Sequence, residues 1–90
     1  MLTVTGRLIC ATEADADALA PAVDEHVRLT PAEPGCLSFD IRRDPDDPRA
    51  FRVDEAFRDR AAFEAHQARM RETDWPARAK DVTRDLEVRD

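Results

Sequence analysis

The chain has 90 residues, of which 42% are hydrophobic, and this is enough for one compact core. We therefore expect a single domain over residues 1–90. The formal net charge of −6 would repel a phosphate backbone, so nucleic acid is not expected as a partner. No apolar run approaches the length of a membrane span, and the first residues lack the pattern of a secretory leader. The sequence therefore predicts a cytoplasmic protein with no membrane partner.

The first predicted element is a strand, because apolar and polar side chains alternate from Leu2 to Cys10. Gly6 in its middle indicates a bulge or the close approach of another group. Thr12 can cap a following helix, in which Pro21 predicts a kink or a loosely formed first turn. The inward stripe of this helix is expected to contain Leu19, Val23, His26, Val27 and Thr30.

Two further strands and a second helix are predicted between residues 33 and 71. Leu37, Phe39 and Ile41 alternate with polar side chains, which is typical of a half-buried strand. A loop rich in proline and aspartate at residues 44–48 should then reverse the chain. The next strand is expected to bury Phe51, Val53, Glu55 and Phe57 on one face. In the second helix, which Asp59 can cap, one face should contain Phe63, His66 and Met70.

The last segment predicts a short turn near Trp75 and Pro76, followed by a fourth strand over residues 82–89. The order of elements is then β-α-β-β-α-β, which predicts a ferredoxin-like α+β fold with a four-stranded antiparallel sheet. Both helices should cover one face of this sheet. Right-handed crossovers place the first and third strands at its centre.

Three polar side chains are expected to point into the predicted core. His66 and His26 lie on the inward stripes of the two helices, and Glu55 lies on the inward face of a strand. A carboxylate in such a place must be paired or must line a cavity. A wet or ligand-filled pocket explains all three, and a structural pair between Glu55 and a histidine is the competing interpretation. Trp75 is expected either to plug the core or to form a wall at the pocket mouth.

Several motifs together resemble the antibiotic biosynthesis monooxygenase family. They are the turn EPGC at residues 33–36, the acidic-aromatic DEAF at 54–57, the Ala-His at 65–66 and the closing TRDLEV at 83–88. Members of this family form homodimers through their sheet faces, as dimeric α+β barrels, and hold a pocket between sheet and helices. The resemblance therefore implies a homodimer of this chain. The characterised branches oxygenate anthrones or quinols without a cofactor, or degrade haem.

The resemblance implies a cofactor-independent monooxygenase that acts with dioxygen on a phenolic, quinol-type or polycyclic aromatic substrate. Such chemistry needs a base and a dry cavity, because the substrate anion itself reduces dioxygen. His66 is the candidate base, since imidazole is largely neutral near pH 7. Glu55 is the candidate group that orients His66. The expected substrate-binding residues are His26, Phe39, Phe57 and Trp75.

No metal or other cofactor is expected. The chain has no pair of histidines or cysteines at metal-ligand spacing. Where the haem-degrading branch carries its axial histidine, this sequence has Trp75 and Pro76. Two other functions remain open: a non-catalytic module that binds a small ligand in the same pocket, and a structural dimer whose pocket is vestigial.

Overall fold

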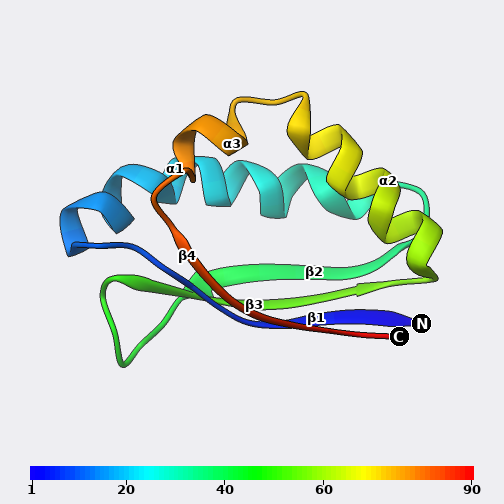
Figure 1. Cartoon of the computed structure of the whole chain (residues 1–90), viewed down its shortest axis with the longest axis horizontal. Coiled ribbons are helices and arrows are strands. Elements are labelled where there is room, and N and C mark those ends of the chain that lie inside the picture. Colours follow the sequence, from blue (N-terminus) through cyan, green and yellow to red (C-terminus); the bar gives the residue numbers. More distant parts are fainter.

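The computed structural model describes all residues from Met1 to Asp90 and has a four-stranded antiparallel sheet with helices on one face (Figure 1). The strands are β1 (Leu2–Ile9), β2 (Cys36–Arg43), β3 (Ala50–Phe57) and β4 (Thr83–Arg89). The helices are α1 (Glu13–Leu29), α2 (Arg60–Arg71) and the short α3 (Trp75–Arg78), with a 3₁₀ turn η1 (Thr30–Ala32) after α1. This order confirms the predicted ferredoxin-like α+β fold.

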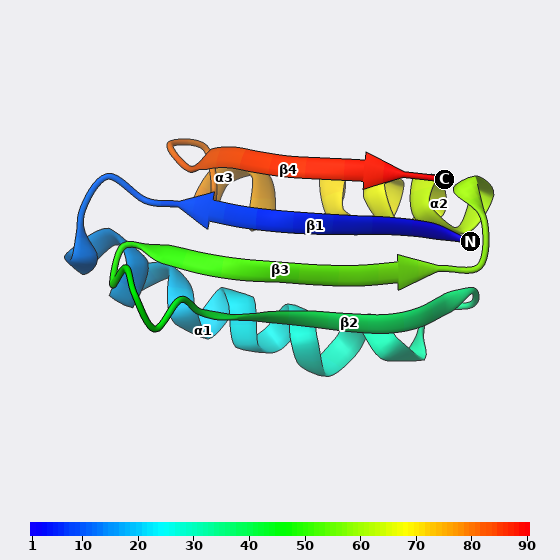
Figure 2. The ribbon, with the colours of Figure 1, turned by 90° about the horizontal axis from the view of Figure 1, so that it is seen from below.

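The strand order β2-β3-β1-β4 confirms that the first and third strands are central. The helices lie behind the sheet in Figure 2, and no element covers the face seen there. On this open face Thr5 of β1 is paired with Asp54 of β3, and Arg7 is paired with Arg52. The open face is therefore polar and charged. None of the helices is both long and apolar enough to cross a membrane.

Both long helices begin at the predicted caps. The Thr12 hydroxyl accepts a hydrogen bond from the backbone N–H of Asp15 at 3.1 Å. The Asp59 carboxylate accepts one from the backbone N–H of Ala62 at 2.9 Å. Each bond satisfies an N–H group that has no partner within the helix. Helix α1 continues without a break through Pro21, which lies on its exposed side.

The core lies between the sheet and α1, and the predicted alternation of β1 and β3 is confirmed. Leu2, Val4 and Leu8 from β1 pack with Phe51, Val53 and Phe57 from β3, and Leu19 and Val23 of α1 cover them. Thr30 is buried at the end of the same stripe, and His26 and Val27 are half-buried.

The loop between β2 and β3 reverses the chain as predicted. In this loop the Asp44 carboxylate accepts a hydrogen bond from the backbone N–H of Asp46.

The prediction that Leu37 of β2 is buried is wrong, because this residue is 58% exposed. Cys36 is paired with Phe57 of β3, and Ser38 is paired with the next residue, Ala56, so Leu37 is an extra residue at a bulge. A bulge shifts the alternation by one position. Beyond it the predicted pattern returns, with Phe39 half-buried and Ile41 buried.

Gly6 allows β4 to approach β1 closely. Its φ of +137° is in a region that residues with side chains rarely adopt, and a Cβ atom there would lie 2.1 Å from the carbonyl oxygen of Asp85. The register of β1 with β3 runs through Gly6 without a shift. Of the two predicted explanations for Gly6, a bulge or the close approach of another group, the structure therefore shows the close approach of β4.

Candidate functional site

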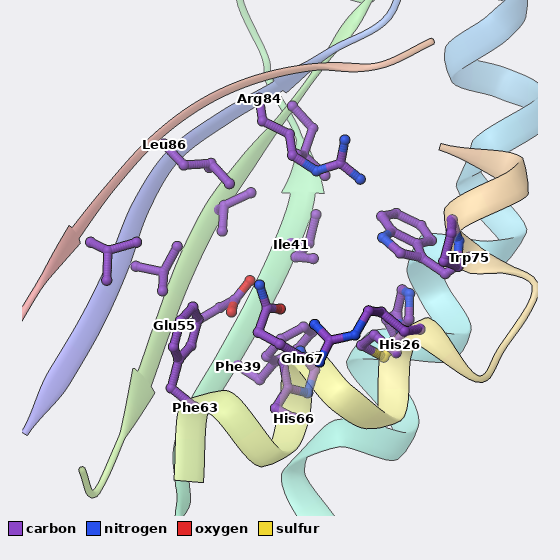
Figure 3. Close-up of a pocket in the computed structure, with 17 residues that line it drawn as sticks. His26, Phe39, Ile41, Glu55, Phe63, His66, Gln67, Trp75, Arg84 and Leu86 are labelled. Carbon is purple, nitrogen blue, oxygen red and sulfur yellow. The ribbon is translucent and has the colours of Figure 1, made fainter. Parts of the chain in front are cut away.

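A cavity of about 340 Å³ lies between the helices and the sheet (Figure 3). Its wall is mostly apolar and includes Phe39, Ile41, Val53, Phe63 and Leu86. The polar side chains that line it are His26, Glu55, His66, Gln67, Arg71 and Arg84. An apolar cavity with a few convergent polar groups is typical of a small-molecule site, and its volume is near the lower end of the usual range of about 300–1,000 Å³.

His66 is paired with Glu33 in the buried part of this site. Its Nδ1 lies 3.0 Å from Oε1 and 3.3 Å from Oε2 of Glu33, and both side chains are less than a tenth exposed. An ionised carboxylate can only accept a hydrogen bond, so Nδ1 must carry the proton. The lone pair of His66 is then on Nε2, the nitrogen that a base would use.

The turn before β2 brings Glu33 to His66. Gly35 in this turn has a φ of +84°, and a Cβ atom on it would lie 2.5 Å from the Cβ of Ala62 in α2. A glycine is therefore needed for the turn to pack directly against α2. Arg69, one turn after His66 on α2, also reaches Glu33, with 2.8 Å between Nη1 and Oε2. Glu33 is thus held between an imidazole and a guanidinium.

The structure does not pair Glu55 with either histidine, as the interpretation of a structural pair had supposed, and His66 is oriented by Glu33 instead of Glu55. Glu55 is buried on β3 and forms no hydrogen bond or ion pair. Arg43 Nε is the only fully buried side-chain nitrogen or oxygen without a hydrogen bond. The Glu55 carboxylate and Nε2 of His66, which form none either, therefore remain accessible from the cavity.

The environment of Glu55 makes its neutral form unusually favourable. Burial, followed by the negative charges of Asp54 and Glu33, raises the pKa of Glu55 from 4.5 to about 7. Figure 3 shows its carboxylate pointing into the cavity from β3. A carboxyl group with this pKa is partly protonated near neutral pH and can both give and take a proton.

His26 and Trp75 form another part of the wall. The rings of the two residues meet edge to face with centroids 4.2 Å apart, and both line the cavity. Trp75 begins α3, where its backbone N–H donates to the Thr73 hydroxyl at 3.2 Å. Burial, followed by the charge of His66, lowers the pKa of His26. Trp75 thus lines the cavity and also packs against the hydrophobic core, so the structure combines its two predicted placements.

The two phenylalanines predicted to contact a substrate have different positions. Phe39 lines the cavity, and its ring centroid lies 5.5 Å from that of His66. Phe57 is only 1% exposed and does not line the cavity. Its ring packs 5.3 Å from the His66 ring and 5.6 Å from Phe63, so it supports the imidazole from within the core.

Sequence reasoning missed Glu33, Gln67, Arg69, Arg71 and Arg84 as parts of the site. Glu33 was visible only as the first residue of the EPGC turn, and nothing in the sequence showed where its side chain would lie. No group of three or more histidine, cysteine, aspartate or glutamate side chains is arranged to hold a metal ion.

Comparison with known proteins agrees with the fold and the motifs. The model of the antibiotic biosynthesis monooxygenase family matches residues 1–75. A solved structure described as an antibiotic biosynthesis monooxygenase is 30% identical over 99% of this chain and 94% of its own, with a TM-score of 0.79. A protein from Nitrosomonas europaea is 22% identical over the same shares of the two chains, with a TM-score of 0.80.

A third similar structure is described as a dimeric ferredoxin-like protein from an uncultured marine organism. It is 17% identical over 98% of this chain and 90% of its own, with a TM-score of 0.72. No protein of curated function matches the sequence.

Proposed function

The chain belongs to the antibiotic biosynthesis monooxygenase family, and we propose that it is a cofactor-independent monooxygenase acting on a phenolic or quinol-type aromatic in the cavity. The observation that carries this proposal is the buried Glu33–His66 pair, which leaves Nε2 of His66 free at an apolar cavity. Because the cavity of about 340 Å³ is small for a ligand site, the substrate is a small aromatic rather than a large polycycle.

The first step is removal of the phenolic proton. Nε2 of His66 takes this proton, and the Glu33 carboxylate stabilises the imidazolium that results. The substrate becomes a phenolate, which is electron-rich enough to reduce dioxygen. The apolar wall around it strengthens the electrostatic interaction with His66 and limits access of water.

The second step forms the new C–O bond. The phenolate gives one electron to dioxygen, and the two radicals combine at an activated ring carbon to form a peroxide anion. Protonated Glu55 gives its proton to this peroxide and then takes the proton from the same ring carbon. The O–O bond breaks, a carbonyl forms, and the leaving hydroxide takes the proton of His66 to become water. One oxygen atom enters the product, and the substrate supplies all the electrons.

Oxygen uptake with a panel of small quinols and phenols tests this proposal, with labelled dioxygen to show that one oxygen atom enters the product. His66→Ala should lower turnover by about 10²–10⁴-fold, the usual contribution of a general base. His66→Gln should be almost as damaging, because an amide cannot accept the proton. Near-full activity of His66→Gln would remove His66 from the role of base.

Oxygen uptake, measured together with binding of the same quinols, also distinguishes this proposal from a second candidate, a ligand-binding module without catalysis. The cavity itself favours this candidate, because it offers an apolar wall and polar groups to any small aromatic. Quinols that bind but consume no oxygen at any pH would establish binding as the function.

We also propose that the protein acts as a homodimer that pairs through the open face of the sheet (Figure 2). Support comes from the absence of any covering element on that face and from the dimeric relative. Light scattering should give twice the mass of the chain at micromolar concentration. A folded monomer under these conditions would contradict the proposal.

A further inference from the structure

Two arginines of the cavity stand apart from most of the arginines in the chain. Arginines such as Arg43, Arg60 and Arg69 have a carboxylate partner. Only Arg28, Arg71 and Arg84 have none within ion-pair distance. Arg71 and Arg84 line the cavity, whereas Arg28 lies on the exposed side of α1.

Arg84 lies at the end of the cavity away from His66 and Glu55. Arg84 of β4 is paired with Leu8 of β1, and Leu8 is paired with Phe51 of β3. Phe51 lies four residues before Glu55 on the same strand. At about 3.4 Å a residue, the positions of Arg84 and Glu55 are separated by roughly 14 Å along the strands. In Figure 3, Arg84 reaches from β4 over one end of the cavity, and Ile41 lies between it and Glu55. An aromatic ring system fits between these ends.

Neither arginine forms an ion pair with a carboxylate of the site. The charged groups that shift the pKa of Glu55 are Asp54 and Glu33. Those that shift the pKa of His26 are His66 and the carboxylates of Glu25, Glu33 and Asp74. Neither arginine is among them. The chain as a whole carries a net charge of −6, so two unpaired guanidinium groups beside an apolar cavity are a local exception to its acidic surface.

We propose that the substrate of this cavity carries a carboxylate, which Arg84 binds at the end away from His66 while the aromatic ring lies between Arg84 and His66. Arg71, which also lines the cavity, adds a second positive charge to the site. A guanidinium matches a carboxylate in shape and can bind it with two parallel hydrogen bonds. The orientation of the ring toward His66 rests on the proposed function, but the binding of an anionic aromatic does not. The two arginines thus select an anionic substrate, and Arg84 fixes which end of it reaches the base.

Calorimetric titration with 2-naphthoate and its neutral counterpart 2-naphthamide tests this inference, because neither ligand needs to be oxidised. At low ionic strength the wild type should bind 2-naphthoate about tenfold more tightly or better, and added salt should reduce this preference. The double variant R71Q/R84Q should bind the two ligands alike. Arg28→Gln removes the same charge from the surface and should keep the preference.

Equal affinity of the wild type for both ligands, or a preference that survives in R71Q/R84Q, would overturn the inference, and so would failure to bind either ligand. Thermal unfolding followed by circular dichroism should show that the double variant is as well folded as Arg28→Gln. The outcome is independent of oxygen uptake. A protein that prefers the anion but consumes no oxygen with any quinol would keep the carboxylate site and lose the monooxygenase.

Discussion

Replacement of Glu55 by glutamine should remove a pH-dependent loss of stability. The pKa of Glu55 is about 7 in the folded protein and 4.5 in the absence of the fold. The unfolded chain therefore loses this proton at lower pH than the folded chain does, and the free energy of unfolding falls as pH rises between these values. At 1.36 kcal/mol for each unit of pKa, the full loss is about 3 kcal/mol above neutral pH. Glutamine keeps the size of the side chain and cannot ionise.

Urea unfolding of the wild type and Glu55→Gln at several pH values measures this effect. The two proteins should have similar free energies of unfolding near pH 4, and the variant should be more stable by about 3 kcal/mol near pH 8. Other carboxylates cancel in the difference because both proteins contain them. Glu64→Gln, an exposed change on α2, is the matched control and should show no such gain. A difference between wild type and Glu55→Gln that is the same at every pH would refute the reasoning.

Two further predictions concern Glu33 and Gly6. Glu33→Gln should lower kcat by about 10²-fold with little change in KM, because it weakens the stabilisation of charged His66 without touching substrate; a change confined to KM or to the melting temperature would show a role in binding or packing only. Gly6→Ala should destabilise the fold by about 2 kcal/mol and lower the melting temperature by roughly 10 °C, because its Cβ would clash with the Asp85 carbonyl at a strained φ. Thr5→Ala, a neighbouring exposed position, should unfold close to the wild-type temperature, and equal stability of the two variants would contradict the close approach.

Local features of the sequence were enough to predict the elements and the buried faces. A strand alternates its side chains between two faces, so the sequence placed Phe51, Val53 and Glu55 on the same side without knowledge of their partners. Helix caps act within three residues, and Thr12 and Asp59 cap as expected. The order of the elements, together with right-handed crossovers, extended these local patterns to the order of the strands in the sheet.

The partners of the polar groups were decided only by the tertiary structure. Glu33 and His66 are 33 residues apart, and they meet because the turn at Gly35 packs against α2. This contact gives His66 an orienting carboxylate other than the expected Glu55 and leaves Glu55 without a partner at the cavity. One bulged residue was likewise enough to turn Leu37 outward.

The tertiary structure alone also decided that Arg71 and Arg84 have no carboxylate partner. The chain has many acidic residues, and whether a given arginine finds one depends on distances of a few ångströms between separate elements. Side-chain periodicity determines which way a residue points, because it follows from the backbone of its own element. Which charge it meets there depends on how the elements pack, and that determined the candidate site of this protein.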